Sequence, residues 1–305
     1  MHSTLQATIL PCPICGSESS LGTSIEGWGT WRRCPSCQMD FADPMKLLEK
    51  PEEMFSAAYE GGRTVSGMSE FGERIAERPT LMRDPSLWFW TPAFETILDW
   101  VETVAPKGGT VLEIGCGLGY VLRALKLRGL DPVGLDVAQL VVELNRQDGM
   151  KVWHGTVETV PDGWVEPKAI VAFFMMHHLP DPMGFLATIR AKWPNTPIAV
   201  AQYGPSNQWG ATALPPRTLF HWSTAGLKAA FEKSGYETTT ISVPYTGADR
   251  RPPALIEKLL RPTIRVPALR RLERRIQRHV MPHLPGKRVD QDYVVVAMGR
   301  PIPQK

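Results

Sequence analysis

The chain has 305 residues, of which 43% are hydrophobic, so it can bury one core of ordinary size with smaller attachments. Its formal net charge of +3 is too mild to indicate nucleic acid as a partner, its start lacks a signal peptide, and no apolar run reaches the ~18 residues of a membrane span. Because four of its five cysteines stand in Cys-x-x-Cys pairs, we expect a reducing, cytoplasmic location.

The first predicted element is a metal site. Cys12 and Cys15 form one pair and Cys34 and Cys37 the other, which gives Cys-x2-Cys-x18-Cys-x2-Cys. This spacing is typical of Zn²⁺ sites in which four thiolates complete a tetrahedron and leave no position for water. We therefore expect a zinc ribbon over residues 1–45 and assign the ion a structural role. The alternative, a redox dithiol, would need only one pair.

Residues 46–95 form a predicted linker. They show no strand alternation, and a helix-compatible piece at 46–59 is followed by glycine and proline breaks. A dense group of aromatic residues at 88–94 then overlaps a helix expected at 93–104. Aromatic side chains at this density usually belong to a hydrophobic core.

A glycine turn at residues 109–122 is the centre of the chain. An apolar strand pattern runs into Gly115, Gly117 and Gly119, and a helix pattern follows them directly. Glycines at alternate positions let the backbone approach a ligand and aim the first helix amides at it. The dinucleotide fingerprint would need a glycine where Tyr120 stands. A turn with a purely structural role is the other interpretation.

This turn and the residues after it resemble motifs I and II of the class I S-adenosylmethionine-dependent methyltransferases. The segment reads Glu-x-Gly-x-Gly-x-Gly from Glu113, and Asp136 ends the next apolar run. The resemblance implies an α/β fold with a Rossmann-like, seven-stranded sheet over residues 96–245 and 290–305. In the family, the turn holds the methionine end of S-adenosylmethionine and the acidic residue takes both ribose hydroxyls. The implied cofactor-binding residues are Glu113, Gly115, Cys116, Gly117, Gly119, Tyr120, Asp136, Val137, Thr156, Val157 and Phe174.

Two later segments resemble further motifs of the family. Residues 155–161 match its Gly-Asp-x-Glu-x-Leu-Pro segment, which grips adenine, except that Thr156 replaces the aspartate. Residues 175–182 match motif IV and carry His177 and His178 at the end of a predicted strand. Carboxyl ends of strands are where ligands bind in open α/β sheets, so we expect two imidazoles near the methyl group. The resemblance also implies that the linker, with Tyr59 first to be tested, forms a lid over cofactor and acceptor.

The candidate catalytic residues are three histidines. Residues 215–223 resemble the family's Pro-Pro-x-His-Leu-x-x-Phe-Ser stretch, with Thr218 in place of the histidine and His221 one helical turn later. Methyl transfer needs mainly alignment, and a general base is required only for an acceptor atom that carries a proton at neutral pH. His177, His178 and His221 can titrate in that range. For each, the alternative is a histidine that is hydrogen-bonded within its own loop.

A basic helical insertion at 246–289 separates the two last predicted strands. Its second predicted helix, at 265–280, has apolar residues along one face, and five arginines lie largely on the opposite face. We expect this helix either to pack on the domain with a solvated basic face or to contact an anionic membrane surface, an acidic partner or a phosphate-bearing acceptor.

Three functions follow from these elements. A zinc ribbon ahead of a class I domain resembles bacterial methyltransferases that act on sugars or other small molecules, so we expect a small-molecule acceptor. The alternative is an RNA or protein acceptor docked through ribbon and insertion, although Arg32 and Arg33 are the ribbon's only evident basic pair. A cofactor-binding module without activity is the third, favoured only by Thr156 and Thr218.

Overall fold

The structure is a computed structural model, and it describes residues 10–25, 28–45, 50–59, 75, 78–79, 82–83, 92–204, 215, 218–244 and 293–303. The predicted insertion at 246–289 lies outside the described residues, and so do the aromatic residues at 88–90. No helix within the described ranges is both long enough and apolar enough to cross a bilayer.

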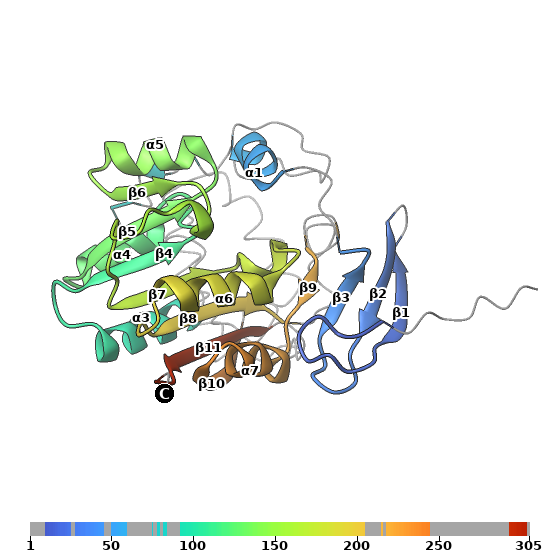
Figure 1. Cartoon of the computed structure of the whole chain (residues 1–305). Helices are drawn as coiled ribbons and strands as arrows, with labels where there is room; N and C mark the ends of the chain where they lie inside the picture. Colours follow the sequence, from blue (N-terminus) through green and yellow to red (C-terminus); the bar gives the residue numbers. More distant parts are fainter. Residues whose placement is uncertain are drawn as a thin grey trace, which may run out of the picture.

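A seven-stranded sheet forms the centre of the protein (Figure 1). Its strands, in spatial order, are β10 (Tyr236–Pro244), β11 (Tyr293–Pro301), β8 (Ile198–Tyr203), β7 (Ala169–Phe173), β4 (Thr110–Ile114), β5 (Asp131–Asp136) and β6 (Lys151–His154). The five strands from β4 to β8 pair in parallel, and β11 pairs antiparallel with both β8 and β10. Short, continuous apolar runs such as Ala-Ile-Val-Ala-Phe in β7 form these strands because both of their faces are buried. The predicted α/β class and the seven strands are confirmed.

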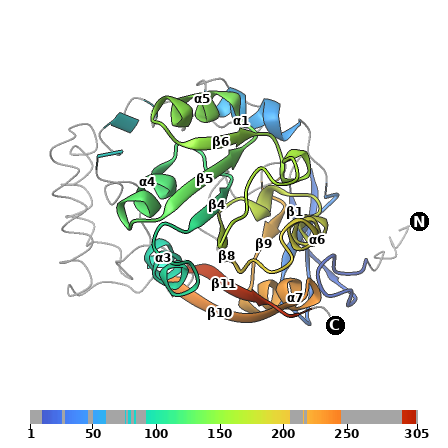
Figure 2. The ribbon, with the colours of Figure 1, turned by 60° about the vertical axis from the view of Figure 1, so that its left-hand side comes forward.

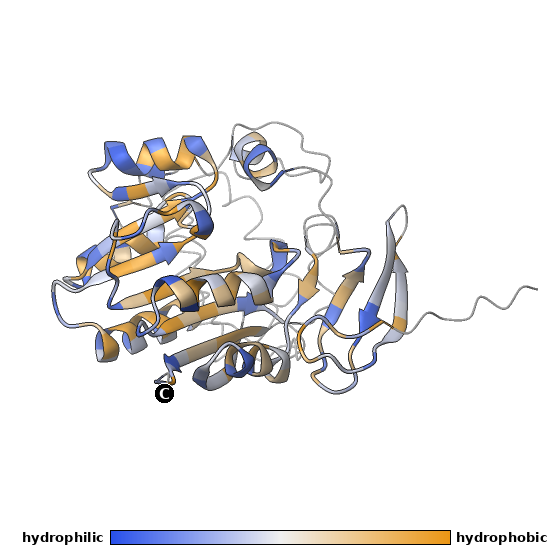
Figure 3. Cartoon of the chain, in the orientation of Figure 1, coloured by the Kyte–Doolittle hydropathy of each residue, from blue (hydrophilic) through white to orange (hydrophobic). Residues whose placement is uncertain are grey.

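Helices cover both faces of this sheet (Figures 1 and 2). One face carries α3 (Pro92–Val104) and α4 (Tyr120–Leu127), with α5 (Gln139–Gln147) packed beside α4, and the other carries α6 (Pro182–Lys192) and α7 (Thr224–Lys233). The central strands are mostly apolar, whereas the helices that cover them carry many polar residues (Figure 3). Helix α6 was not predicted, although Asp181 caps it by accepting a hydrogen bond from the Gly184 amide at 2.8 Å.

The chain order reverses at β4, which pairs with β5 on one side and with β7 on the other. The helix that follows β5 and the helix that follows β7 therefore pack on opposite faces of the sheet. In an open α/β sheet, the ligand binds at the carboxyl ends of the strands where the chain order reverses in this way. The glycine turn follows β4, Asp136 ends β5, and the motif IV histidines follow β7. All three sequence motifs consequently lie at one edge of the sheet.

A second, smaller sheet joins the N-terminal ribbon to the rest of the protein (Figure 1). Its order is β1 (Ser20–Ile25), β2 (Gly29–Arg33), β3 (Asp40–Asp43) and β9 (Phe220–His221). The segment at Phe220–His221 is therefore extended. Its backbone is held in this form because the Ala42 amide donates to the Leu219 carbonyl at 2.9 Å and β9 pairs with β3.

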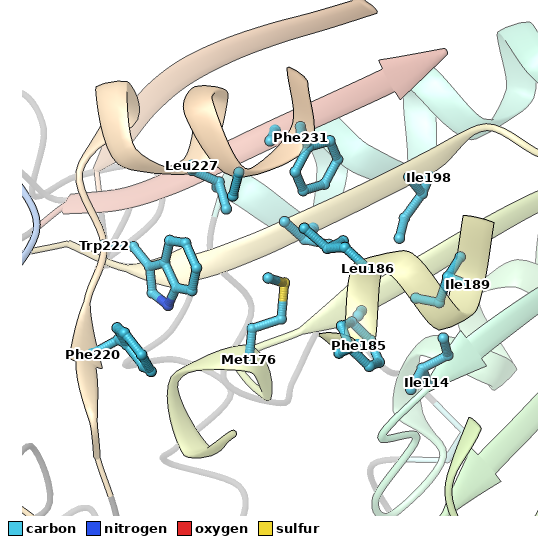
Figure 4. Packing of buried hydrophobic residues seen from close by; sticks show 14 of the residues in the cluster. Ile114, Met176, Phe185, Leu186, Ile189, Ile198, Phe220, Trp222, Leu227 and Phe231 are labelled. Carbon is cyan, nitrogen blue, oxygen red and sulfur yellow. The ribbon is translucent and has the colours of Figure 1, made fainter. Parts of the chain in front are cut away.

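The ribbon and the large sheet share one hydrophobic core. Cys37 and Met39 of the ribbon belong to the same buried cluster as Trp222 and Leu227, and Figure 4 shows the part of that cluster between α6, α7 and the strands. Lys233 of α7 also donates to the Ile14 carbonyl at 3.0 Å. The ribbon is thus an integral part of the folded body.

Helix α1 (Pro51–Tyr59) lies beside α5, near the glycine turn (Figure 1). Phe55 and Tyr59 of this helix pack against a small buried cluster that contains Leu118 and Tyr120 from the turn and Val141 from α5. The helix predicted at 46–59 is confirmed over Pro51–Tyr59, and residues 46–49 lie outside the described residues.

Candidate functional site

The four paired cysteines form one cluster. Their sulfur atoms all lie within 4.8 Å of one another, with 3.6 Å between Cys12 and Cys37 and 3.3 Å between Cys15 and Cys34. Each pair forms a tight turn, since the Gly16 amide donates to the Cys12 carbonyl and Gln38, at φ 58°, donates to the Cys34 carbonyl. The hydrogen bond from Cys37 lowers the pKa of the Cys12 thiol. Four thiols at these distances fit a tetrahedral metal ion.

The backbone of the glycine turn strongly favours glycine at three positions. Gly115, Gly117 and Gly119 have φ values of 74°, 47° and 82°, which residues with a side chain rarely adopt. A Cβ atom at Gly119 would lie 1.8 Å from Oδ1 of Asn145, and one at Gly117 would lie 2.9 Å from the hydroxyl of Tyr59. Tyr59 is therefore seated on the glycine turn, as a lid residue would be.

An asparagine and an arginine that the sequence analysis missed hold this turn in place. Asn145, fully buried on α5, donates from Nδ2 to the Gly117 carbonyl at 2.8 Å. Arg78 donates to Oδ1 of Asn145 at 3.1 Å and to the Leu118 carbonyl at 3.0 Å, and it forms an ion pair with Asp148 at 2.7 Å. No recognised motif contains these residues, so only the fold reveals them.

Asp136 meets the glycine turn from the neighbouring strand. Its carboxylate accepts hydrogen bonds from the amides of Gly117 at 2.8 Å and Ala138 at 2.9 Å. Burial raises the pKa of Asp136, while these amide hydrogen bonds act in the opposite direction. A carboxylate offers about four lone-pair positions, so acceptor capacity remains for a ligand's hydroxyl group.

Glu113 carries a buried oxygen that has no protein partner. Its Oε2 atom makes no hydrogen bond to any described residue, and the side chain is 3% exposed. Burial raises the pKa of Glu113 well above its usual range, and the nearby charge of Asp136 adds to this effect. Such an unpaired acceptor beside a glycine turn suits the ammonium group of an amino acid, which is the methionine end of S-adenosylmethionine.

The other predicted cofactor residues lie within the turn, on α4, or in the segments that follow β5 and β6. Burial raises the pKa of the Cys116 thiol, and Cys116 packs with Leu122 and Val142 in a small buried cluster. Val137 contacts Nε2 of His154 through its carbonyl at 3.1 Å, and Thr156 begins the 3₁₀ turn that places Val157, 2% exposed, in the core. Tyr120 is buried beneath α1.

Phe174 stands in a strained conformation at the end of β7. Its φ of 52° is unusual for a bulky residue and costs about 1–2 kcal/mol. The ring stacks on Tyr203 with centroids 4.4 Å apart, and it lies 5.8 Å from the ring of Phe94. Strain of this kind is concentrated at functional sites because the surrounding structure maintains it.

The motif IV histidines lie together on the 3₁₀ turn Met176–His178. The ring centroids of His177 and His178 are 3.8 Å apart, and His178 also meets Phe55 of α1 edge to face at 5.1 Å. His177 is 3% exposed, and its ring centroid is 5.2 Å from that of Tyr203. Aromatic and imidazole rings thus lie together at the carboxyl ends of β7 and β8.

His221 has different surroundings. Its ring stacks on Trp31 of the ribbon, with centroids 4.4 Å apart, and its backbone pairs with Asp40 of β3. The side chain is 9% exposed. These contacts favour a role in packing the ribbon against the domain.

Comparison with known proteins agrees with this geometry. A family model described as "Methyltransferase domain" matches residues 89–241. The ribosomal protein L11 methyltransferase of Burkholderia vietnamiensis is 32% identical over 116 residues, which are 35% of this chain and 37% of that protein. The ubiquinone biosynthesis O-methyltransferase of Bordetella avium is 29% identical over 94 residues, or 28% of this chain and 39% of that protein. The chain thus matches well under half of the length of these relatives.

A solved structure shows the same fold. It is a complex between the Haloferax volcanii Trm112 methyltransferase activator and a methyltransferase, and it superposes with a TM-score of 0.50 at 20% identity. The superposition covers 77% of this chain and 97% of the solved chain. At this identity the similarity concerns the fold alone.

Proposed function

The chain belongs to the class I S-adenosylmethionine-dependent methyltransferases, and we propose that it transfers the methyl group to a small-molecule acceptor. The observation that carries this proposal is the position of the ribbon, which the competing RNA or protein acceptor would need as a docking surface. One edge of the ribbon sheet is occupied by β9 of the domain, and its cysteine core is shared with α7. The ribbon is therefore packed into the core of the domain, and this face of it is not available as a docking surface.

The charges of the ribbon support the same conclusion. Arg32 forms an ion pair with Asp43 at 2.7 Å, and Arg33 forms a bidentate pair with Asp40 at 2.7 and 2.9 Å. Phosphate recognition uses cations that are available to the ligand. Both arginines of the ribbon's basic pair are thus engaged by carboxylates of the ribbon itself.

We propose that the residues around the glycine turn hold S-adenosylmethionine, whose sulfonium supplies an electrophilic methyl group. Glu113 would receive the ammonium group on its unpaired oxygen, the amides of the turn would face the carboxylate, and Asp136 would accept the ribose hydroxyls. Val157 would pack against the adenine, and Tyr59 would cover the turn. The four cysteines would hold a structural Zn²⁺ ion.

The acceptor would bind beside the rings that follow β7 and β8. Phe174 and Tyr203 offer stacked aromatic surfaces, while His177 and His178 offer groups that can accept a proton. Of the three candidate histidines, His177 is the one we propose as the general base for an acceptor with an O–H or N–H group. His178 would line the site below α1, and His221 would brace the ribbon.

The proposal is tested by measuring which class of molecule receives a radioactive methyl group. Purified protein is incubated with tritiated S-adenosylmethionine and a bacterial extract that has been separated into small molecules, RNA and protein. We expect label in the small-molecule fraction, its absence with a Gly117→Arg variant, and a product heavier by one methylene unit in mass spectrometry. Enzyme-dependent label in RNA or protein alone would refute the acceptor class, and no transfer to any fraction would favour a binding module without activity.

A further inference from the structure

Gln202 contacts His177 at two points. This glutamine is the residue before Tyr203 at the carboxyl end of β8, and it is fully buried. Its Oε1 atom lies 3.2 Å from the backbone nitrogen of His177 and 3.1 Å from the Nδ1 atom of its ring. The Nε2 atom of Gln202 has no hydrogen-bond partner among the described residues. All the visible hydrogen bonds of this side chain are therefore directed at one histidine.

These contacts fix which atoms donate. A backbone N–H can only donate, so the Gln202 atom that faces the His177 amide must be the oxygen, and a flipped amide would place N–H against N–H. The same oxygen faces Nδ1 of the ring, which must then carry the proton and donate it. A neutral His177 consequently holds its proton on Nδ1, and its Nε2 atom keeps the lone pair.

The backbone of His177 is fixed from its other side as well. The Leu219 amide donates to the His177 carbonyl at 2.8 Å, and the Leu219 carbonyl accepts from Ala42 of the ribbon at 2.9 Å. The backbone amide and the ring are thus held by Gln202, and the backbone carbonyl is held by a segment tied to the ribbon. These contacts favour one orientation of the imidazole and its Nδ1–H tautomer.

We propose that Gln202 is a positioning residue of the active site, which sets the tautomer of His177 so that Nε2 can act as general base. This inference rests on the proposed function. The Nε2 lone pair takes the proton of the acceptor O–H or N–H as that oxygen or nitrogen bonds to the methyl carbon. The carbon–sulfur bond breaks in the same step, and its electron pair stays on sulfur. The protonated imidazole retains its Nδ1–H···Oε1 hydrogen bond, which stabilises the positive charge.

An alternative is that Gln202 serves stability alone. Its amide nitrogen is buried and has no partner in the part of the chain that the structure describes, so this side chain is a poor choice for stability, because an unmet hydrogen-bonding group weakens the fold. Leucine has a similar volume and would leave no such group. The polar side chain is explained if its oxygen is needed to orient the ring.

Nitrogen NMR of labelled histidine tests the inference, because the two ring nitrogens have different shifts in each tautomer. The His177 signals are identified by their loss in a His177→Gln variant. We expect the Nδ1–H tautomer in the wild type and in Gln202→Glu, whose carboxylate accepts the same two hydrogen bonds. Gln202→Leu should give a mixture of tautomers and lower label transfer to the small-molecule fraction by about 10- to 100-fold.

Calorimetry with S-adenosylhomocysteine separates this inference from the proposed function. Affinity should be unchanged in Gln202→Leu, whereas a wild type that fails to bind would refute the proposed function instead. A matched control is Tyr236→Phe, which deletes another buried and unpaired polar group, at the far end of the sheet, and should leave the tautomer and label transfer intact.

The opposite results would overturn the inference. They are an Nε2–H tautomer in the wild type, or full label transfer with an unchanged tautomer in Gln202→Leu. Should Gln202→Leu fail to fold in circular dichroism, the wild-type and Gln202→Glu spectra still decide between the two tautomers.

Discussion

Replacement of Asn145 by alanine should loosen the glycine turn from behind. The side chain is fully buried and makes three hydrogen bonds: to the carbonyls of Gly117 and Val141, both at 2.8 Å, and from Arg78 at 3.1 Å. A neutral hydrogen bond contributes about 0.5–1.5 kcal/mol, and one that involves a charged group about 1.5–3 kcal/mol. Because Arg78 keeps Asp148 and Leu118 as partners, we expect the free energy of unfolding to fall by about 3 kcal/mol.

The effect on the cofactor follows from the same contacts. Without Asn145 the Gly117 carbonyl is no longer held, so the amides of the turn lose their fixed direction toward the ligand. We expect the affinity for S-adenosylhomocysteine to fall about tenfold, which corresponds to about 1.4 kcal/mol. Asn145→Asp should weaken binding at least as much, since it keeps an acceptor for Arg78 but sets a carboxylate oxygen against the Gly117 carbonyl.

Urea unfolding followed by circular dichroism measures the first effect, and isothermal titration calorimetry measures the second. The matched control is Gln139→Ala on the same helix, which removes an exposed hydrogen bond to Glu143 and should change stability by less than about 0.5 kcal/mol. The reasoning is refuted if Asn145→Ala loses less than about 1 kcal/mol, or if its loss equals that of the control.

Further predictions concern the buried acid, the metal and the lid. The pKa of Glu113 is raised in the folded protein, so folding binds a proton and the free energy of unfolding falls as the pH rises from the ordinary carboxyl value toward the raised one. Glu113→Gln should therefore increase stability to urea at neutral pH, flatten its pH dependence and weaken S-adenosylmethionine binding; an unchanged pH profile would contradict this. Removal of metal with a chelator should lower the melting temperature and alter tryptophan fluorescence, because Trp31 and Trp222 belong to the same hydrophobic core as the cysteines; elemental analysis without zinc would exclude a zinc site. Tyr59→Ala should lower the affinity for S-adenosylhomocysteine about 3- to 10-fold with little loss of stability, since Tyr59 lies directly on Gly117; equal affinities in calorimetry would speak against a lid.

The large sheet could be predicted because its signals are local. Buried parallel strands are continuous apolar runs, and the run into Gly115 together with the acidic end of β5 marks the ligand edge. The cluster of four cysteines could be predicted from spacing alone. Helix α6 was missed although its signals were present: Asp181 at the cap and Pro182 at the first position lay inside a segment that was interpreted only as the end of motif IV.

Other features could not be predicted because they depend on contacts between distant segments. Strand β9 has two residues, too few for a periodic pattern, and it is extended only because β3 pairs with it. Asn145 stands among helix-surface polar residues in the sequence, and Gln202 is one polar residue at the end of an apolar strand. Their importance appears only when the fold brings them to Gly117 and His177.

Isothermal titration of S-adenosylmethionine into the protein tests the central claim most directly. We predict that the wild type binds one molecule per chain and that Asp136→Ala, still folded by circular dichroism, shows no binding, because the ribose hydroxyls lose their acceptor and the Gly117 amide its partner. A wild type that does not bind, or a variant that binds with the wild-type affinity, would contradict the assignment of this site.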